Sequence, residues 1–569
     1  MTTDEDFTPP EFPDEFNLAD YFLYDRLDEG LGGKTAIRYG SHEYTFSEIA
    51  ERTTALARYF RSVGVAQEQR IFTVLPDTPP FAWSFYATLA RGSVVAMANP
   101  YKPVDDLEYA VDYGRMAAVV TIPETAEKMA DTLLESPHLK TLLLVPDVQT
   151  GADPEQSVDI PPKFRGASFE VRPLTSALNF GRNADESEFA PTLADDYAIW
   201  LFTAGSTGRP KGCVHSHKDF AHNTECFAKH TLGYEEDDVT VAVPNLYFGY
   251  ATGTNLMFPH AVGATTALYS ERPTPETLAS AINRYEPTIV TNVPTMMSKL
   301  LDYEDAQREA GEEGIDMESC RFHTSAGEAL APSLLDRFMG TYDVDVYDGI
   351  GSAEMFHIYV TNRPGDIKPS SLGKEVDGYE VKILPIDAEG PGAEEVEQGE
   401  TGELWVKGDS VAHGYYRKRE TSWDTFYGHW CRTGDLFRRD EDGYLYLEGR
   451  ADALFKASGI WVAPKEVEDC LQEHQAVANA AVIPAEKTDG LVKPKAFVVV
   501  REGFTNRVED DASKRELRTE LQEHVKTSIS KHKYPRWVVF TDDLPRNDRG
   551  KVNSKELIRR EEAGENPWE

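Results

Sequence analysis

The segment 201–217, LFTAGSTGRPKGCVHSH, combines glycines, hydroxyl residues and cations directly after a run of apolar residues. Its glycines adopt backbone conformations that other residues resist, so successive N–H groups can converge on an anion. The residues that would supply these amide and hydroxyl groups are Thr203, Gly205, Ser206, Thr207 and Gly208. Two cations, Arg209 and Lys211, add charge suited to a polyphosphate. The segment predicts a polyphosphate-binding loop, with a surface turn after a strand as the alternative.

Two other interpretations of this segment have less support. Its spacing does not match GxxxxGK[ST], the pattern of P-loop NTPases, and no segments typical of kinases accompany it. Three nearby histidines could suggest a metal centre: His215, His217 and His222. Because no further cluster supplies the rest of a ligand set, we interpret them as helix-start and packing residues.

Repeated strand–helix units are the elements that would position this loop. Short apolar runs, each bounded by proline, glycine or charge, lie at 71–75, 94–98, 117–122 and 142–145. Apolar periodicity predicts a helix over 48–63, with Ser47 as its cap and Gly64 at its end. Such alternation favours a parallel sheet covered on both faces. Residues 147–195, rich in Pro, Gly and acids, predict a surface connection before a second series of units.

The pattern changes twice in the last 200 residues. Short strands with glycine-rich turns between 370 and 450 predict a small distorted β-barrel. Beyond Arg450, a helix starting at Pro464, a helix near 513–529 and strands at 479–483, 496–500 and 537–540 predict an α+β domain. The expected fold is therefore α/β. A large N-terminal domain, 1–450, would hold two doubly wound αβ subdomains and the barrel, and a smaller mobile domain would span 451–569.

The chain is strongly acidic, with 58 Lys and Arg against 97 Asp and Glu and a net charge of −39. Such a charge opposes nucleic acids and anionic membranes. Because the acids are spread along the chain, we interpret them as adaptation to a salt-rich cytoplasm, where screening acts over about 3 Å at 1 M. Five cysteines without a CxxC pair fit a reducing, cytoplasmic compartment. No apolar run is long enough to cross a membrane, so membrane insertion is not expected.

Read together with further motifs, the loop 203–212 resembles that of the adenylate-forming enzymes. This superfamily comprises acyl- and aryl-CoA synthetases, peptide-synthetase adenylation domains and luciferases. The other motifs that carry the resemblance are TSAGE 324–328, DGIGSAE 348–354, TGEL 401–404, RTGD 432–435, GRAD 449–452, SG 458–459, PKEVE 464–468 and PRNDRGK 545–551.

A closer resemblance is to the benzoate-CoA ligase branch. The segments that carry it are NLYFGY 245–250, SERPTP 270–275, NVPT 292–295, DGIGSAEMFHI 348–358 and KYPRW 533–537. In that branch an aromatic acid is surrounded by positions that match Phe248, Gly249, Tyr250, Gly351, His357 and Ile358. Alanine is usual where this chain has Gly249, which implies a larger pocket.

The resemblance implies an ATP-dependent acid–CoA ligase that forms an acyl-AMP, releases pyrophosphate and passes the acyl group to CoA. The loop with Lys211 would hold phosphates, and Glu354 would be the catalytic, Mg²⁺-associated carboxylate. The residues expected to contact ATP or AMP are Ser325, Gly327, Glu328, Asp348, Gly349, Ile350, Asp435 and Arg450. Ala353 replaces the usual threonine, and the loss of one hydroxyl contact, about 0.5–1.5 kcal/mol, implies weaker nucleotide binding.

The resemblance also implies domain alternation. Lys551 would bridge the carboxylate and the α-phosphate during adenylation. A rotation about Asp452 would then replace it with the loop containing Ser458 and Gly459, which would open the path for the CoA thiol. A hinge of this kind needs only a few residues to absorb the dihedral change.

Several alternatives stay open at this point. The enzyme could load a carrier protein, although no carrier-like domain occurs in these 569 residues, or act on short- or medium-chain acids. A nucleotide-binding regulator without catalysis is conceivable because of Ala353, whereas Glu354 and Lys551 argue against it. The expected partners are a carboxylic acid, ATP and CoA, not nucleic acid, and a homodimer stays open.

The acidic composition generates a first prediction. Because dissolved ions screen repulsion among the carboxylates, the chain should unfold at a higher temperature in molar KCl than in dilute buffer. Thermal unfolding over a KCl series measures this. Equal stability and activity in dilute buffer would contradict adaptation to salt.

Overall fold

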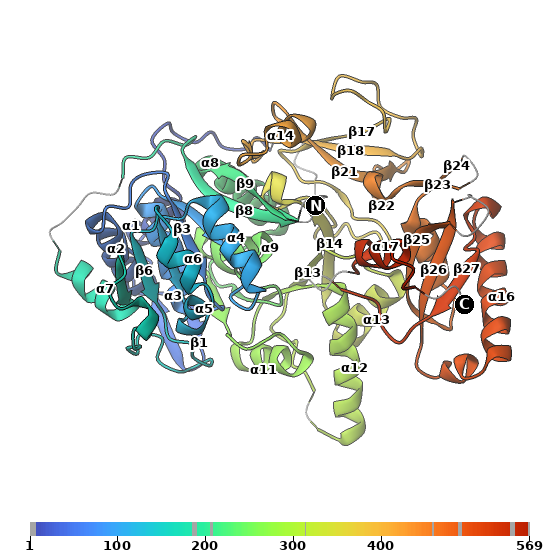
Figure 1. Ribbon diagram of the computed structural model, residues 1–569, viewed down its shortest axis with the longest axis horizontal. Coiled ribbons are helices and arrows are strands. Elements are labelled where there is room, and N and C mark those ends of the chain that lie inside the picture. Colours follow the sequence, from blue (N-terminus) through green and yellow to red (C-terminus); the bar gives the residue numbers. More distant parts are fainter. Residues whose placement is uncertain are drawn as a thin grey trace. The chain divides into compact units, whose positions relative to one another are not determined.

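The computed structural model describes residues 7–184, 190–204, 209–312, 314–457, 460–486, 492–546 and 552–566. Two compact units make up the chain, and each is described by itself (Figure 1). Unit 1 consists of Met1–Val381 with Trp405–Arg432, and unit 2 consists of Lys382–Leu404 with Thr433–Glu569. The domain boundary expected between residues 450 and 451 stays a prediction.

The first sheet of unit 1 has eight strands in the order β19-β9-β8-β4-β3-β5-β6-β7. Their bounds are β3 (Arg70–Val74), β4 (Val94–Met97), β5 (Ala118–Thr121), β6 (Thr141–Leu144), β7 (Glu170–Pro173), β8 (Tyr197–Ala204), β9 (Pro210–Ser216) and β19 (Gly414–Tyr415). Strands β3 to β8 pair in parallel, whereas β9 is antiparallel to both β8 and β19. The predicted apolar runs form β3 to β6, whose residues are almost all buried, as in a sheet covered on both faces.

Two local predictions near this sheet were wrong. Helix α2 (Phe46–Ser62) is capped by Thr45, not Ser47, because Thr45 and Glu48 form a reciprocal capping box. The expected surface connection at 147–195 contains β7 and helix α7 (Leu174–Arg182). Strand β7 is only four residues long and has no buried residue, so its sequence lacks the apolar run that would predict a strand.

The second sheet of unit 1 has nine strands in the order β16-β15-β14-β13-β12-β10-β11-β1-β2. Their bounds are β1 (Thr35–Tyr39), β2 (His42–Thr45), β10 (Val239–Ala242), β11 (Thr265–Leu268), β12 (Ile289–Asn292), β13 (Phe322–Ala326), β14 (Asp345–Gly351), β15 (Ile358–Thr361) and β16 (Lys374–Glu375). The central strands pair in parallel, and β2, β15 and β16 pair antiparallel at the edges. The two sheets confirm the predicted doubly wound α/β class.

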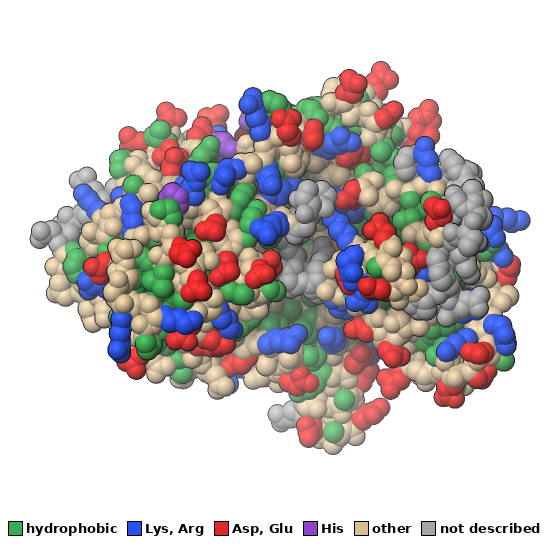
Figure 2. Space-filling view, in the orientation of Figure 1, with side chains coloured by type: hydrophobic (Ala, Val, Ile, Leu, Met, Phe, Trp, Pro, Cys, Tyr) green, Lys and Arg blue, Asp and Glu red, His purple; other side chains and the backbone are tan. Residues whose placement is uncertain are grey.

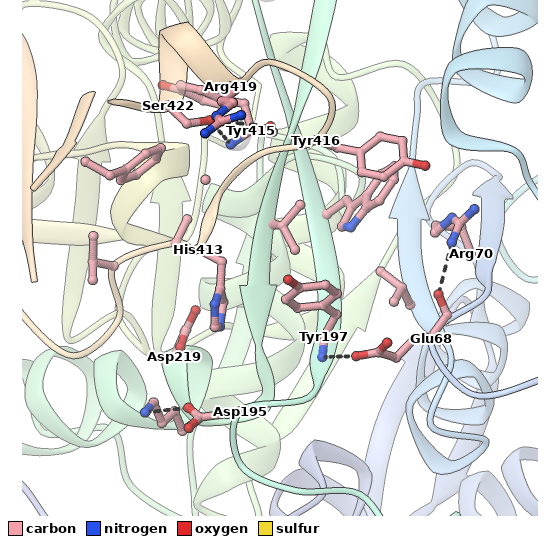
Figure 3. A pocket seen from close by; sticks show the side chains of 18 of the residues that line it. Glu68, Arg70, Asp195, Tyr197, Asp219, His413, Tyr415, Tyr416, Arg419 and Ser422 are labelled. Carbon is pink, nitrogen blue, oxygen red and sulfur yellow. Dashed lines mark hydrogen bonds and ion pairs between the residues drawn. The ribbon is translucent and has the colours of Figure 1, made fainter. Parts of the chain in front are cut away.

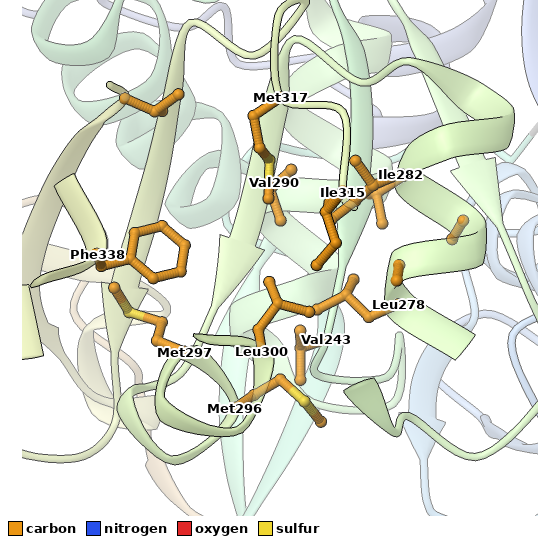
Figure 4. Close-up of a cluster of buried hydrophobic side chains, with 14 of the residues drawn as sticks. Val243, Leu278, Ile282, Val290, Met296, Met297, Leu300, Ile315, Met317 and Phe338 are labelled. Carbon is orange, nitrogen blue, oxygen red and sulfur yellow. The ribbon is translucent and has the colours of Figure 1, made fainter. Parts of the chain in front are cut away.

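Three helices cover the core of this second sheet (Figures 1 and 4). They are α11 (Pro275–Tyr285), α12 (Pro294–Ala310) and α13 (Pro332–Tyr342). Each begins with proline, whose missing N–H costs nothing in the first turn. Figure 4 shows Leu278, Met297, Leu300 and Phe338 gathered in this core, all fully buried.

Unit 2 contains the predicted α+β domain (Figure 1, orange to red). Strands β25 (Val477–Glu486), β26 (Val492–Val500) and β27 (Trp537–Phe540) form its sheet. Helices α15 (Pro464–Gln472) and α16 (Asp511–Ser528) pack on one side, and α17 (Ser554–Glu562) packs near β25. The glycine-rich region before this domain forms a five-stranded sheet of β17 (Glu380–Leu384), β18 (Gly402–Lys407), β20 (Phe426–Tyr427), β21 (Trp430–Arg439) and β22 (Leu445–Arg450).

The surface carries the expected acidic side chains. Figure 2 shows Asp and Glu side chains spread over the face in view and interspersed with Lys and Arg. Among the described residues, none of the helices combines the length and apolar character of a membrane span.

The core under α12 generates a second prediction. Leu300→Ala should lower the free energy of unfolding by about 2–5 kcal/mol, because it leaves a cavity among fully buried side chains. Lys299→Ala, at the exposed neighbouring position, is the matched control and should change stability by less than about 0.5 kcal/mol. Denaturant unfolding measures both, and equal effects would contradict the packing described here.

Candidate active site

The segment predicted to bind polyphosphate connects two antiparallel strands, β8 and β9. The register of β8 and β9 places Thr203 directly opposite Lys211 and Ala204 opposite Pro210. The side chains of Thr203 and Lys211, both predicted to contact phosphate, therefore lie side by side at the end of the strand pair. The other four predicted loop residues, Gly205, Ser206, Thr207 and Gly208, lie outside the described residues.

Lys211 and Glu354 are linked through Tyr415, a residue that the sequence did not indicate. The ammonium of Lys211 lies 3.5 Å from the centre of the Tyr415 ring. The Tyr415 hydroxyl donates to Glu354 Oε1 at 2.6 Å. Burial and the Glu354 carboxylate raise the pKa of Tyr415, so its hydroxyl keeps the proton that it donates. A cation, an aromatic ring and a carboxylate thus form one arrangement beside the loop.

Glu354 lies in a short turn between β14 and β15. Its turn, η5 (Ala353–Met355), is held to the segment just before β19, because the N–H of Ala412 donates to Glu354 O at 2.9 Å. The next residue, Phe356, has a φ of +69°, a conformation that costs a residue other than glycine free energy. A carboxylate offers the hard oxygen ligands that Mg²⁺ prefers, so Glu354 fits a magnesium-binding role.

The residues expected around adenine follow two neighbouring parallel strands. The register of β13 and β14 pairs Ser325 with Asp348 and Ala326 with Gly349. Burial raises the pKa of the Asp348 carboxyl to about 7, against the opposing effects of the Ser325 hydroxyl and the Gly349 N–H. Asp348 Oδ1 is buried and has no hydrogen-bond partner in the described part of the chain. A ligand that donates a hydrogen bond would satisfy this oxygen.

The remaining expected adenine residues lie near these two strand ends. Gly327 follows β13 with a φ of +90°, where glycine is the favoured residue. The N–H and the hydroxyl of Thr295 donate to the Glu328 carboxylate at 3.0 Å and 2.6 Å. Glu328 therefore also anchors the start of α12. Ile350 lies on β14, opposite Val360 of β15.

The six residues expected around the acyl group come from two segments. Helix α9 (Gly249–Thr252), with Phe248 as its N-cap, carries Gly249 and Tyr250. Gly351, on β14, pairs with Ile358 of β15 and follows Ile350 directly. His357 joins the two segments because its Nε2 donates to Tyr250 O at 3.0 Å. Burial lowers the pKa of His357 to about 4, so the ring is neutral.

Two of these positions leave little room for a larger residue. A Cβ atom on Gly351 would lie 2.4 Å from His357 O, which is too close for any side chain. A Cβ atom on Gly249 would lie 3.1 Å from a methyl group of Leu201. The glycine at 249 thus accommodates Leu201 of β8, and an alanine there would require Leu201 to shift slightly.

Three expected residues of unit 2 form one ion-pair group. Arg450 Nη1 lies 2.9 Å from Asp435 Oδ1, its cross-strand partner, and Arg450 Nε lies 3.2 Å from Asp452 Oδ1. Burial lowers the pKa of Arg450, but the Asp435 and Asp452 carboxylates outweigh it and raise the pKa. Ser458, Gly459 and Lys551 lie outside the described residues.

A separate cavity of about 900 Å³ lies in unit 1, within the usual size range of ligand pockets. Figure 3 shows Glu68 and Arg70 on one side of it and Asp219 and His413 on the other. Tyr415 also lines it, but none of the residues predicted for the nucleotide or the acid does.

With this geometry described, comparison with known proteins identifies the family. The family model "AMP-binding enzyme" matches residues 25–416. The chain belongs to the AMP-binding enzyme family. A second model, "AMP-binding enzyme C-terminal domain", matches residues 466–551 of this AMP-binding enzyme.

Curated relatives and solved structures agree with this assignment. The enzyme is 36% identical to a benzoate–CoA ligase of Thauera aromatica over 97% of this chain and 98% of that protein. It is 34% identical to a 4-hydroxybenzoate–CoA/benzoate–CoA ligase of Rhodopseudomonas palustris, over 95% and 93% of the two chains. The crystal structure of a benzoate CoA ligase from Burkholderia xenovorans matches with a TM-score of 0.80 at 34% identity, covering 95% and 99%.

Asp348 generates a third prediction. Because its folded pKa of about 7 lies above 3.8, the stability that protonated Asp348 contributes is present at low pH and lost as pH rises towards 7. Between pH values near 4 and 7, the free energy of unfolding of the wild type should therefore fall by up to about 4 kcal/mol more than that of Asp348→Asn. Unfolding at several pH values measures this difference. Asp336→Asn, at an exposed position of α13, is the control, and a pH-independent difference for Asp348→Asn would contradict the prediction.

Proposed function

We propose that this AMP-binding enzyme is an ATP-dependent ligase that joins an aromatic, benzoate-like carboxylic acid to CoA. The observation that carries the proposal is the grouping of Lys211, Tyr415 and Glu354 at the polyphosphate loop. The curated relatives that match nearly the full length are named for the same chemistry, as benzoate and hydroxybenzoate CoA ligases.

The proposed reaction has two steps. A carboxylate oxygen attacks the α-phosphorus of ATP, the bond to the β-phosphate oxygen breaks, and acyl-AMP and pyrophosphate form. The CoA thiolate then attacks the acyl carbon and AMP leaves, which gives the thioester. Such a site must place positive charge near the phosphates and keep water from the mixed anhydride.

Each step has candidate residues in this chain. Thr203 and Lys211 would hold the outer phosphates and the departing pyrophosphate, and Tyr415 would keep Glu354 oriented. A bound Mg²⁺ would offset phosphate charge, and Glu354 is the residue proposed to hold it. Asp348 Oδ1, which is buried without a partner among the described residues, would accept from the amino group of adenine.

We further propose that the C-terminal domain, 451–569, alternates between the two steps about Asp452. The ion pair between Arg450 and Asp452 is half exposed, so its rearrangement would cost little. In the adenylation arrangement Asp435 and Arg450 would contact the ribose and phosphates, and Lys551 would bridge the acid and ATP. In the other arrangement the loop with Ser458 and Gly459 would border the thiol path.

The proposed acid-binding residues are those on α9, β14 and β15, which include Tyr250 and His357. Aromatic walls and the glycine at 351 suit a flat ring. None of the five cysteines is in a disulfide, which fits the proposed cytoplasmic location.

The decisive experiment is a pyrophosphate-release assay in molar KCl over benzoate, hydroxybenzoates, aminobenzoates and aliphatic acids, followed by detection of the CoA thioester. We expect a benzoate-like acid to give ATP cleavage and thioester. Thioester from aliphatic acids alone would reject the aromatic substrate class. Cleavage without thioester would favour an acceptor other than CoA.

The proposed role of Lys551 in the first step alone gives a fourth prediction. Lys551→Ala should slow acyl-AMP formation at least about 100-fold, because it removes a positioned charge, whereas thioester formation from supplied acyl-AMP should survive. Lys555→Ala, at an exposed position of α17, is the matched control and should leave both steps intact. Equal loss of both steps in Lys551→Ala would contradict the proposed role.

A further inference from the structure

A buried histidine lies beneath the Glu354 turn. His215 is on β9, four residues after Lys211. Its Nδ1 lies 3.0 Å from Asp219 Oδ2, and its Nε2 lies 2.6 Å from the carbonyl oxygen of Ala353. The side chains of His215 and Asp219 are 0% and 2% exposed.

The hydrogen bonds define how this pair is oriented. A carbonyl oxygen only accepts, so His215 Nε2 must donate to Ala353 O. Asp219 accepts the N–H of Ser216 at 3.0 Å and the hydroxyl of Ser216 at 2.5 Å. Because Asp219 Oδ2 also lies within hydrogen-bond distance of His215 Nδ1, Asp219 fixes the orientation of the imidazole ring.

Polar groups are costly to bury unless each has a hydrogen-bond partner. Here both ring nitrogens and both carboxylate oxygens are engaged. Removing one member would leave a buried polar group without its partner. The pair therefore holds one geometry, and the part of the chain that it holds is the carbonyl of Ala353.

That carbonyl directly precedes Glu354. The turn is fixed at three points: Ala353 O by His215, Glu354 O by Ala412, and the Glu354 carboxylate by Tyr415. The positive φ of Phe356 is unfavourable for a residue other than glycine, so the three bonds must outweigh its cost. The ring of Phe220 also packs against the ring of Phe356, with 3.7 Å between the ring centres.

We propose that His215 and Asp219 are positioning residues for Glu354: His215, oriented by Asp219, donates to the Ala353 carbonyl and so fixes the turn from which the Glu354 carboxylate projects. This inference rests on the proposed role of Glu354 toward Mg²⁺ and ATP. The bond ends on the main chain, so it does not depend on which side chain stands at position 353.

Two substitutions at one position separate positioning from mere packing. The amide of His215→Gln can still donate to Ala353 O, whereas His215→Asn is too short to reach it. His215→Asn should lower kcat for pyrophosphate release about 10–100-fold and raise the half-saturating Mg²⁺ concentration at least about fivefold. His215→Gln should stay within about threefold of the wild type in both, as a partial replacement of the donor.

His217→Asn is the matched control. His217 is equally buried two residues away, but its Nδ1 accepts from Leu18 N and does not contact the Glu354 turn. This variant should leave the Mg²⁺ dependence unchanged even where thermal unfolding shows lower stability. A wild-type Mg²⁺ dependence in His215→Asn, or an equal shift in His217→Asn, would overturn the proposal.

Calorimetric binding of ATP with and without Mg²⁺ provides a readout independent of activity. If no acid gives pyrophosphate in the wild type, the proposed function fails, and the binding data still decide the positioning role. A weaker Mg²⁺ effect on ATP binding in His215→Asn but not in His215→Gln would support it. The same Mg²⁺ effect in all variants would reject it.

Discussion

A buried polar group that lacks a partner costs about 1–3 kcal/mol, and this constraint acts on the Ala353 carbonyl, the Glu354 carbonyl and the Glu354 carboxylate. This requirement connects β9, the turn and β19, which are far apart in the sequence. His215, Ala412 and Tyr415 supply the partners. The Lys211 ammonium, over the Tyr415 ring, then lies on the same framework as the carboxylate. A cation for phosphate and an anion suited to a metal are thus held by shared neighbours rather than by separate loops.

Elements determined by short stretches of sequence were predictable. The apolar runs became β3 to β6, and Pro464 starts α15, because burial on both faces and proline geometry act locally. The sequence predicts Ser47 as the cap of α2, two residues after the observed cap, Thr45. Glu48 follows Thr45 at the spacing of a capping box, and the two reciprocal hydrogen bonds favour Thr45 over Ser47. Strand β7 depends on its neighbour β6 for pairing, which composition does not report.

The candidate site was predictable where it follows motifs and not where it depends on pairing between distant segments. Ser325 and Asp348 were both named from motifs, and the register of β13 and β14 places them side by side. Tyr415 is 61 residues from Glu354, and His215 is 138 residues from Ala353. No periodicity or spacing links such positions, so only the folded arrangement reveals their bonds. The sequence therefore indicates only a packing role for His215 and not its bond to the carbonyl of Ala353.

The close approach of Gly249 to Leu201 couples the residues proposed to bind the acid to β8, which ends at Ala204. A methyl group at 249 needs only a slight shift of the Leu201 side chain, whereas a longer side chain would have to displace it further. Changes at position 249 are therefore not independent of position 201. Larger residues at 249 should have evolved together with smaller ones at 201, so the history of substrate choice should be recorded in this pair of positions.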